Sequence, residues 1–205
     1  MWTWLGKWFV ACGKARAFCE GRYQLARLKS AGRRVSVGRD FSVYGPECIT
    51  VEDDVILAHQ ITLRALTAYP WAQPPQTFHP EIILRRGCFL NNRTEISAVG
   101  RIEIGANTMF GPGCFVTDHA HGYEDATRSP RHQPIAAGGE LVIGEDGWLG
   151  ANVCVAGPVR LGRHCIVGAN SVVTGDLPDF CLAAGAPARV IKRYDPASGQ
   201  WRAPT

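Results

Sequence analysis

Between residues 143 and 177 the sequence repeats every six residues, and this period restricts the fold more than any other feature of the chain. Each hexad opens with an aliphatic residue, namely Ile143, Leu149, Val155, Leu161, Val167 and Val173. Four positions later stands a residue compact or apolar enough to face inward: Gly147, Val153, Val159, Cys165, Ser171 and Leu177. A period of six fits neither an amphipathic helix nor an alternating strand. It predicts a solenoid in which three hexads, about 18 residues, close one triangular coil.

The same phase continues upstream. Aliphatic or aromatic positions recur at Val37, Val43, Val51, Leu57, Leu63, Leu84, Leu90, Ile96, Ile104, Phe110 and Val116, with inward positions at Val55, Ile61, Cys88, Thr94, Gly100, Thr108 and Cys114. Gly or Ala follows the aliphatic residue in most of the later hexads, and we expect it to let the backbone bend at the corner. We therefore predict an all-β parallel β-helix over residues 35–177, an N-terminal helical segment over 1–34 and a C-terminal cap and tail over 178–205.

Two insertions interrupt the phase, at residues 64–81 and 118–140. The first is rich in proline and aromatic residues, and the second carries three histidines. Loops on a stiff repeat scaffold usually carry binding and catalysis. We expect a substrate-binding lip that includes Tyr69, Trp71, His79, His119 and Tyr123. The alternative is that both insertions are solvent-exposed loops without a role in binding.

The eight cysteines do not form a disulfide pattern. Cys88, Cys114 and Cys165 occupy small inward positions of the repeat, where a thiol acts as a small hydrophobe. The chain has no CxxC pair, and residues 1–13 lack the apolar run of a cleavable signal peptide. We expect reduced thiols and a cytoplasmic protein without a metal site.

Positive charge gathers at the N-terminus. Residues 1–40 hold nine Lys or Arg against Glu20 and Asp40, which gives +7 and leaves −3 for the remainder of a chain whose net charge is +4. The same segment contains Trp2, Trp4, Trp8 and Phe9. We expect it mainly to cap the first coil, with weak, salt-sensitive contact to an anionic membrane, at its inner face, as a secondary role. No stretch is long enough to span a bilayer, and no nucleic-acid-binding module accompanies the basic run.

These residues resemble a known family. The hexads, the segment Gly147-Trp148-Leu149-Gly150-Ala151-Asn152 and the run Ala183-Ala184-Gly185-Ala186-Pro187-Ala188-Arg189-Val190-Ile191 are similar to hexapeptide-repeat acetyltransferases, in particular the sugar O-acetyltransferases. The resemblance implies a left-handed parallel β-helix, a homotrimer, and acetyl-CoA as co-substrate. Matching positions are frequent from about residue 84 to 193 and few before residue 35.

Acetyl transfer to an alcohol requires a base, because a sugar hydroxyl is a weak nucleophile at neutral pH. His121 lies nine residues after Pro112, an offset that matches the catalytic histidine of the family, so we predict His121 as the base rather than His119. Asp118 or a backbone carbonyl would orient the imidazole. Asn91 matches a family asparagine near the acceptor hydroxyl, and Asn92 is the second candidate for this role. Alternatively, these asparagines have only a structural role, in an asparagine ladder inside the coil.

The resemblance also implies a binding site for acetyl-CoA. Trp148 would line the slot for the pantetheine arm, backbone groups of Ala151 and Ala169 would hold its amides, and Arg189 and Lys192 would meet the phosphates. Where many relatives have Thr-Lys-Asp, this chain has Thr174-Gly175-Asp176, so one cation near the nucleotide is missing.

The acceptor expected from this resemblance is a sugar of a surface-polysaccharide or lipopolysaccharide precursor, and a xenobiotic such as an antibiotic is the alternative. Two other classes rank lower. A zinc enzyme similar to γ-class carbonic anhydrases would need His119 and His121 with His79 or His164 as third ligand. A non-catalytic β-helix would not require His121, Asn91 and Trp148 together.

Overall fold

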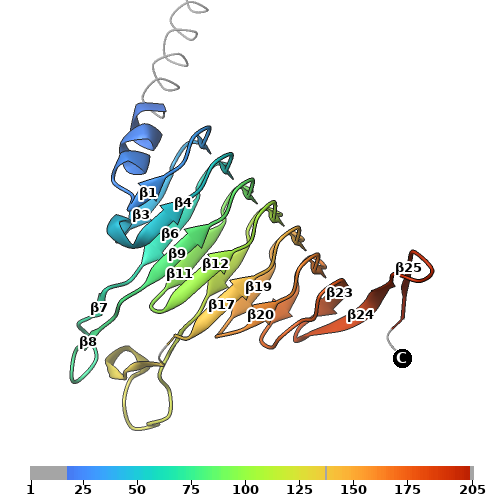
Figure 1. The fold of residues 1–205 in the computed structure, drawn as a ribbon. Helices are drawn as coiled ribbons and strands as arrows, with labels where there is room; N and C mark the ends of the chain where they lie inside the picture. The colour runs from blue at the N-terminus through green and yellow to red at the C-terminus, as the bar shows by residue number, and fades with distance from the viewer. Residues whose placement is uncertain (1–17, 137, 204–205) are drawn as a thin grey trace, which may run out of the picture.

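The computed structural model describes residues 18–136 and 138–203 (Figure 1). The N-terminal aromatic residues Trp2, Trp4, Trp8 and Phe9 lie outside the described residues, so the membrane contact expected of them stays a prediction. Residues 18–26 form a helix, and a short 3₁₀ turn, η1 (Pro46–Cys48), lies between the first and second coils. No helix in residues 18–136 and 138–203 is long and apolar enough to cross a membrane.

Three sheets of short parallel strands form the sides of a triangular β-helix (Figure 1). Sheet A contains β1 (Ser30–Ala31), β4 (Ile49–Val51), β9 (Glu81–Leu84), β12 (Arg101–Ile104), β17 (Glu140–Ile143) and β20 (Arg160–Leu161). Sheet B contains β2 (Ser36–Val37), β5 (Ile56–Leu57), β10 (Phe89–Leu90), β13 (Met109–Phe110), β18 (Trp148–Leu149), β21 (Ile166–Val167) and β23 (Cys181–Gly185). Sheet C contains β3 (Ser42–Tyr44), β6 (Thr62–Ala65), β11 (Glu95–Ala98), β14 (Phe115–Thr117), β19 (Cys154–Ala156) and β22 (Val172–Val173).

Sheet B continues beyond the coils. The long strand β24 (Ala188–Asp195) turns back antiparallel on β23, and β25 (Gln200–Arg202) pairs with β24. Together they form the C-terminal arm at the end of the solenoid (Figure 1). At the other end, β1 pairs with β4 and so precedes residue 35, where the repeat was expected to begin. Its Ser30 and Ala31 carry no aliphatic hexad signal, because β1 joins the sheet through its main chain alone.

The core confirms the hexad register. The aliphatic residues of every hexad from Leu149 to Val173 are at most 1% exposed, and so are the inward Val153 and Cys165. Polar inward residues are satisfied by corner carbonyls: Thr94 Oγ1 donates to Asn91 O at 2.7 Å. Burial of Cys88 raises the pKa of its thiol to about 12, as expected for a small core residue.

The glycines that follow the aliphatic residues serve a different purpose from the one expected. The bend is made two residues later by residues with positive φ, such as Asn152 (φ 57°) and Asn170 (φ 58°), a conformation that asparagine tolerates. Gly150 instead lies directly against the next coil, and a Cβ there would stand 2.6 Å from the backbone nitrogen of Ala169. The close stacking of coils, and not the bend, therefore requires glycine at this position.

Both insertions form antiparallel hairpins on the edge where sheet C turns into sheet A. The first contains β7 (Ala68–Tyr69) and β8 (Gln76–Thr77). The second contains β15 (Ala120–His121), the 3₁₀ turn η2 (Pro130–His132) and β16 (Ile135–Ala136). The two hairpins lie together beside the solenoid (Figure 1).

Candidate functional site

The two hairpins contact each other through polar side chains. Gln76 Nε2 donates to the carbonyl of Ile135 at 3.1 Å, and the amide of Ile135 donates to Gln76 Oε1 at 2.7 Å. Tyr69 donates its hydroxyl proton to the carbonyl of Arg131 at 2.6 Å. The Arg131 guanidinium carbon lies 4.5 Å from the centre of the Trp71 ring. Segments more than fifty residues apart thus form one loop cluster, which we call the lip.

Asp118 and His119 form the most tightly held polar pair of the lip. The Asp118 side chain is fully buried, and its two oxygens accept the backbone amides of Val99 at 3.0 Å and Gly100 at 2.7 Å. Oδ1 also lies 2.9 Å from His119 Nδ1. An ionised carboxylate only accepts, so this contact places the proton of His119 on Nδ1 and leaves Nε2 as a free acceptor. The His119 side chain is 12% exposed.

His121, the predicted base, is exposed and makes a longer contact. Its Nδ1 lies 3.4 Å from the Tyr69 hydroxyl, and the two rings are 5.5 Å apart. Because Tyr69 gives its own proton to Arg131, its oxygen accepts from His121 Nδ1. Asp118 therefore contacts His119 and not His121. Tyr123 is 74% exposed, and His79 is also on the surface.

The residues expected to bind acetyl-CoA lie elsewhere, along the edge between sheets B and C. Trp148 points outward from β18 and is 47% exposed. Ala151 and Ala169 occupy equivalent positions in successive coils, and their amides donate no hydrogen bond within residues 18–136 and 138–203. At the corresponding position of the first coil, the amide of Arg39 donates to a side-chain atom, His59 Nδ1, at 2.9 Å. The two alanine amides are therefore open to a ligand.

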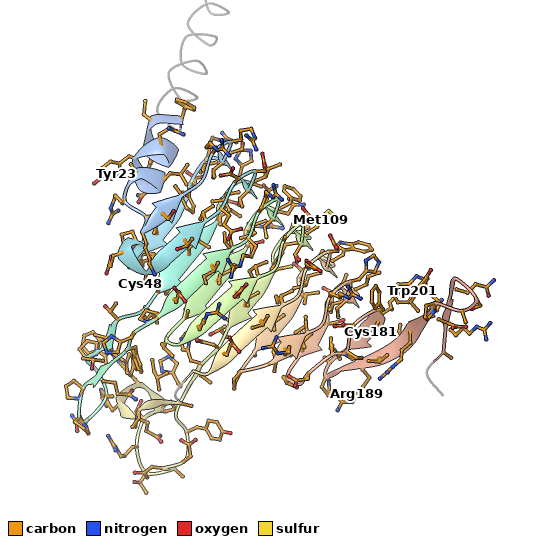
Figure 2. The ribbon with its side chains drawn as sticks, viewed as in Figure 1. Tyr23, Cys48, Met109, Cys181, Arg189 and Trp201 are labelled. Atoms are coloured by element: carbon orange, nitrogen blue, oxygen red, sulfur yellow. The ribbon has the colours of Figure 1, made fainter. Side chains whose placement is uncertain are left out.

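Asn91 lies on the same edge, at the position that Gly150 occupies two coils later. Its Oδ1 accepts the amide of Asn92 at 2.8 Å, which fixes the side chain beside its own backbone. Arg189 and Lys192 lie on the exposed arm strand β24; Arg189 is labelled in Figure 2. Neither forms an ion pair with another described residue. Gly175 is exposed, and a Cβ there would meet nothing within 4 Å.

The lip and the edge with Trp148 stand at opposite ends of sheet C. In the fourth coil the chain crosses this sheet between Pro112 and Asp118, six residues that span roughly 15–20 Å when extended. Within one chain, the histidines are therefore separated from Asn91 and Trp148 by a whole face of the β-helix.

Among residues 18–136 and 138–203, no three His, Cys, Asp or Glu side chains are grouped so that they could hold a metal ion. His164, considered as a third zinc ligand, instead lies at the C-terminal end. Its ring stacks on Trp201 of the arm at 6.3 Å and lies 5.7 Å from Phe180 (Trp201 labelled in Figure 2).

Three residues of the lip were not identified from the sequence. Gln76 joins the hairpins, Thr117 places its hydroxyl 3.1 Å from His119 Nδ1, and Arg131 covers Trp71. Thr117 directly precedes Asp118 at a buried strand end, a position that could have indicated it. Gln76 and Arg131 follow no local pattern.

Residues 141–175 match the family model described as bacterial transferase hexapeptide, six repeats. This segment of the chain is therefore similar to the hexapeptide-repeat transferases. A solved N-acyltransferase of Bacillus cereus, AntD in complex with dTDP and 3-hydroxybutyryl-CoA, superposes with a TM-score of 0.69 over 87% of this chain and 90% of that chain, at 18% identity. The expected fold, a left-handed parallel β-helix with an N-terminal helix, is confirmed.

Two sequence relatives come from Escherichia coli (strain K12). WbbJ, whose name assigns it to lipopolysaccharide biosynthesis as an O-acetyl transferase, is 36% identical over 55% of this chain and 60% of its own length. A galactoside O-acetyltransferase is 30% identical over 61% of this chain and 61% of its own length. The chain thus spans about three fifths of the length of these relatives, and the resemblance to this branch of named acetyltransferases is confirmed.

Proposed function

We propose that this protein transfers an acetyl group from acetyl-CoA to a hydroxyl of a sugar, in a precursor of a surface polysaccharide or lipopolysaccharide. The relatives named for acetyl transfer to sugars support the reaction class. The observation that carries the proposal is the Asp118–His119 pair: a buried carboxylate, fixed by two backbone amides, holds an imidazole at 2.9 Å.

This geometry suits a general base. With Nδ1 held by Asp118, Nε2 of His119 would take the proton of the acceptor hydroxyl as its oxygen attacks the acetyl carbonyl carbon. The buried carboxylate would stabilise the imidazolium, which then returns the proton to the departing thiolate of CoA. Fixing Asp118 through two amides keeps its charge in place during the reaction. We therefore propose His119 as the base, while His121, favoured by its offset from Pro112, is the rival that mutation must test.

Acetyl-CoA would lie along the edge between sheets B and C. Trp148 would cover the pantetheine arm, and the open amides of Ala151 and Ala169 would bind its carbonyl groups. Arg189 and Lys192, both exposed and free of ion pairs among the described residues, would meet its phosphates. Bound acetyl-CoA would supply the acyl group.

The separation of the two groups across sheet C supports a homotrimer. The lip of one chain would reach the Trp148 edge of its neighbour, so that three sites form between three chains. Sheet B carries an outward column of apolar residues in register, Ile56, Phe89, Met109, Trp148 and Ile166 (Met109 in Figure 2). Such a column is typical of a surface covered by another molecule.

The test is release of CoA thiol from acetyl-CoA with a panel of glycosides as acceptors. We expect acceptor-dependent release and a sequential initial-rate pattern, because no serine or cysteine in the lip contacts either histidine as a nucleophile would. A ping-pong pattern with a trapped acetyl-enzyme would contradict direct attack. Absence of turnover together with absence of acetyl-CoA binding would contradict the reaction class.

A further inference from the structure

We propose that Trp71 and Arg131 bind a phosphate group carried by the sugar acceptor, so that the substrate is a glycosyl phosphate or diphosphate rather than a neutral sugar. This inference rests on the proposed acetyl transfer to a sugar, and it names the class of acceptor.

Arg131 differs from most of the arginines on the coils. Those on the coils are mostly paired with carboxylates, as Arg85 is with Glu52 and Glu103 and Arg163 is with Asp179. Arg131 is exposed, and within residues 18–136 and 138–203 its guanidinium forms no ion pair and no side-chain hydrogen bond. Its planar group, with its donors free, is the shape that binds phosphate through two parallel hydrogen bonds.

The guanidinium is also held in place before any ligand arrives. It lies 4.5 Å above the Trp71 ring, and its own backbone carbonyl accepts the Tyr69 hydroxyl at 2.6 Å. The two bonds between Gln76 and Ile135 fix the hairpins on which both partners stand. Ordering a long side chain on binding costs free energy, and here most of that ordering is already present.

The surroundings suit an anion. Residues 66–80 of the first hairpin contain no Asp or Glu. In the second hairpin, the Asp125 carboxylate accepts the hydroxyl and amide of Thr127, and the Glu124 carboxylate accepts the amide of Tyr123, so neither carboxylate pairs with Arg131. The exposed Trp71 adds an aromatic surface of the kind on which a sugar ring or a base stacks.

The position relative to the histidines fits an acceptor site. Tyr69 bridges the Arg131 carbonyl and His121 Nδ1, and His119 lies two residues from His121 on the same hairpin. A phosphate on Arg131 would thus place the attached sugar against the proposed base, whereas the phosphates of CoA belong to the arm on the far side of sheet C.

The experiment is calorimetric titration of the full protein in saturating CoA, which fills any phosphate site used by the coenzyme. The probes are glucose 1-phosphate and methyl α-glucoside, which differ in the phosphate. We expect the phosphate to bind at least tenfold more tightly at low salt, and we expect this advantage to fall about tenfold in Arg131→Gln. Arg39→Gln, which removes an exposed charge on the first coil, is the control and should keep the advantage.

Equal binding of the two probes, no binding of either, or an advantage that survives in Arg131→Gln would overturn the proposal. Two further probes distinguish the natural sources of the phosphate: dTDP-glucose represents a nucleotide sugar, and a short polyprenyl diphosphate glucose represents a lipid-linked one. Tighter binding of either than of glucose 1-phosphate supports the proposal and names the source. Because the titration needs no turnover, Arg131-dependent binding without acetyl transfer would refute only the proposed function.

Discussion

The hydrogen-bond partners of His119 and His121 differ, and they favour His119 as the proposed base. Asp118 lies 2.9 Å from His119, whereas His121 has a tyrosine hydroxyl at 3.4 Å. We predict that His119→Ala lowers kcat by roughly 10²–10⁴-fold, the range for loss of a general base, with little change in acetyl-CoA affinity. Asp118→Asn should lower kcat by a smaller factor, because Nδ1 loses its carboxylate but the imidazole remains.

His121→Ala is the matched variant for this measurement, since it removes the same ring from the same hairpin. We expect it to change the KM for the acceptor more than kcat. If His121→Ala abolishes turnover while His119→Ala stays active, the offset from Pro112 identifies the base correctly and the contact with Asp118 is structural.

A substitution at Gly175 should strengthen the binding of acetyl-CoA. It stands where the family resemblance leads us to expect lysine, and the surrounding space is open. Gly175→Lys should tighten binding of acetyl-CoA about threefold to tenfold at low salt, as expected for one exposed charge near a phosphate. Gly175→Gln controls for length; an equal gain in that variant, measured by calorimetry, would show that charge is not the cause.

Among the elements, the N-terminal helix is expected to stabilise the first coil. Leu25 and Leu28, from the helix and the turn that follows it, are 5% and 9% exposed and belong to the same core as Phe41 and Val43. Leu25→Ala should cost about 2–4 kcal/mol of unfolding free energy, and deletion of residues 1–30 should lower the melting temperature. An equally stable truncated protein that no longer sediments with anionic vesicles would instead identify the segment as a membrane anchor.

The ion pairs on the outer face of sheet A should make the stability of the fold depend on pH. Lys29 holds the pKa of Glu81 below its ordinary 4.5. Burial alone would raise the pKa of Glu103, but hydrogen bonds from Arg85 and Arg101 outweigh it and lower that pKa also. Carboxylates with lowered folded-state pKa values stabilise the fold above the unfolded value and lose that contribution as pH falls through the folded value.

The melting temperature should therefore fall as the pH drops from about 5 to 3. In Glu103→Gln this fall should be smaller, because the group no longer titrates. A variant whose melting temperature keeps the same dependence on pH would show that Glu103 is not among the groups responsible.

The elements that the sequence predicts well are those built on repetition. Leu149, Val155 and Cys165 follow from the period, because every coil buries the same positions. The lip could not be predicted in this way. The contact between Tyr69 and His121 joins hairpins 52 residues apart, and no local pattern determines which of two neighbouring histidines receives a buried carboxylate.

At the scale of the whole molecule, the chain has its lip and its Trp148 edge on different corners of the β-helix. Ion pairs cover sheet A, whereas sheet B exposes an apolar column. A neighbouring copy that brings a lip to this edge would complete the site and cover part of the column. A monomer with full activity in dilute solution would exclude such an arrangement.

Mixing two inactive variants tests whether each active site is shared between two chains. His119→Ala lacks the base, and Ala169→Trp, at an exposed position, blocks the slot for acetyl-CoA. After unfolding and refolding in equal amounts, trimers of both chains would contain one intact site each, and the mixture should recover about a quarter of wild-type activity. If the mixture stays as inactive as its components although mixed trimers form, each site lies within one chain, and the proposed site between chains is wrong.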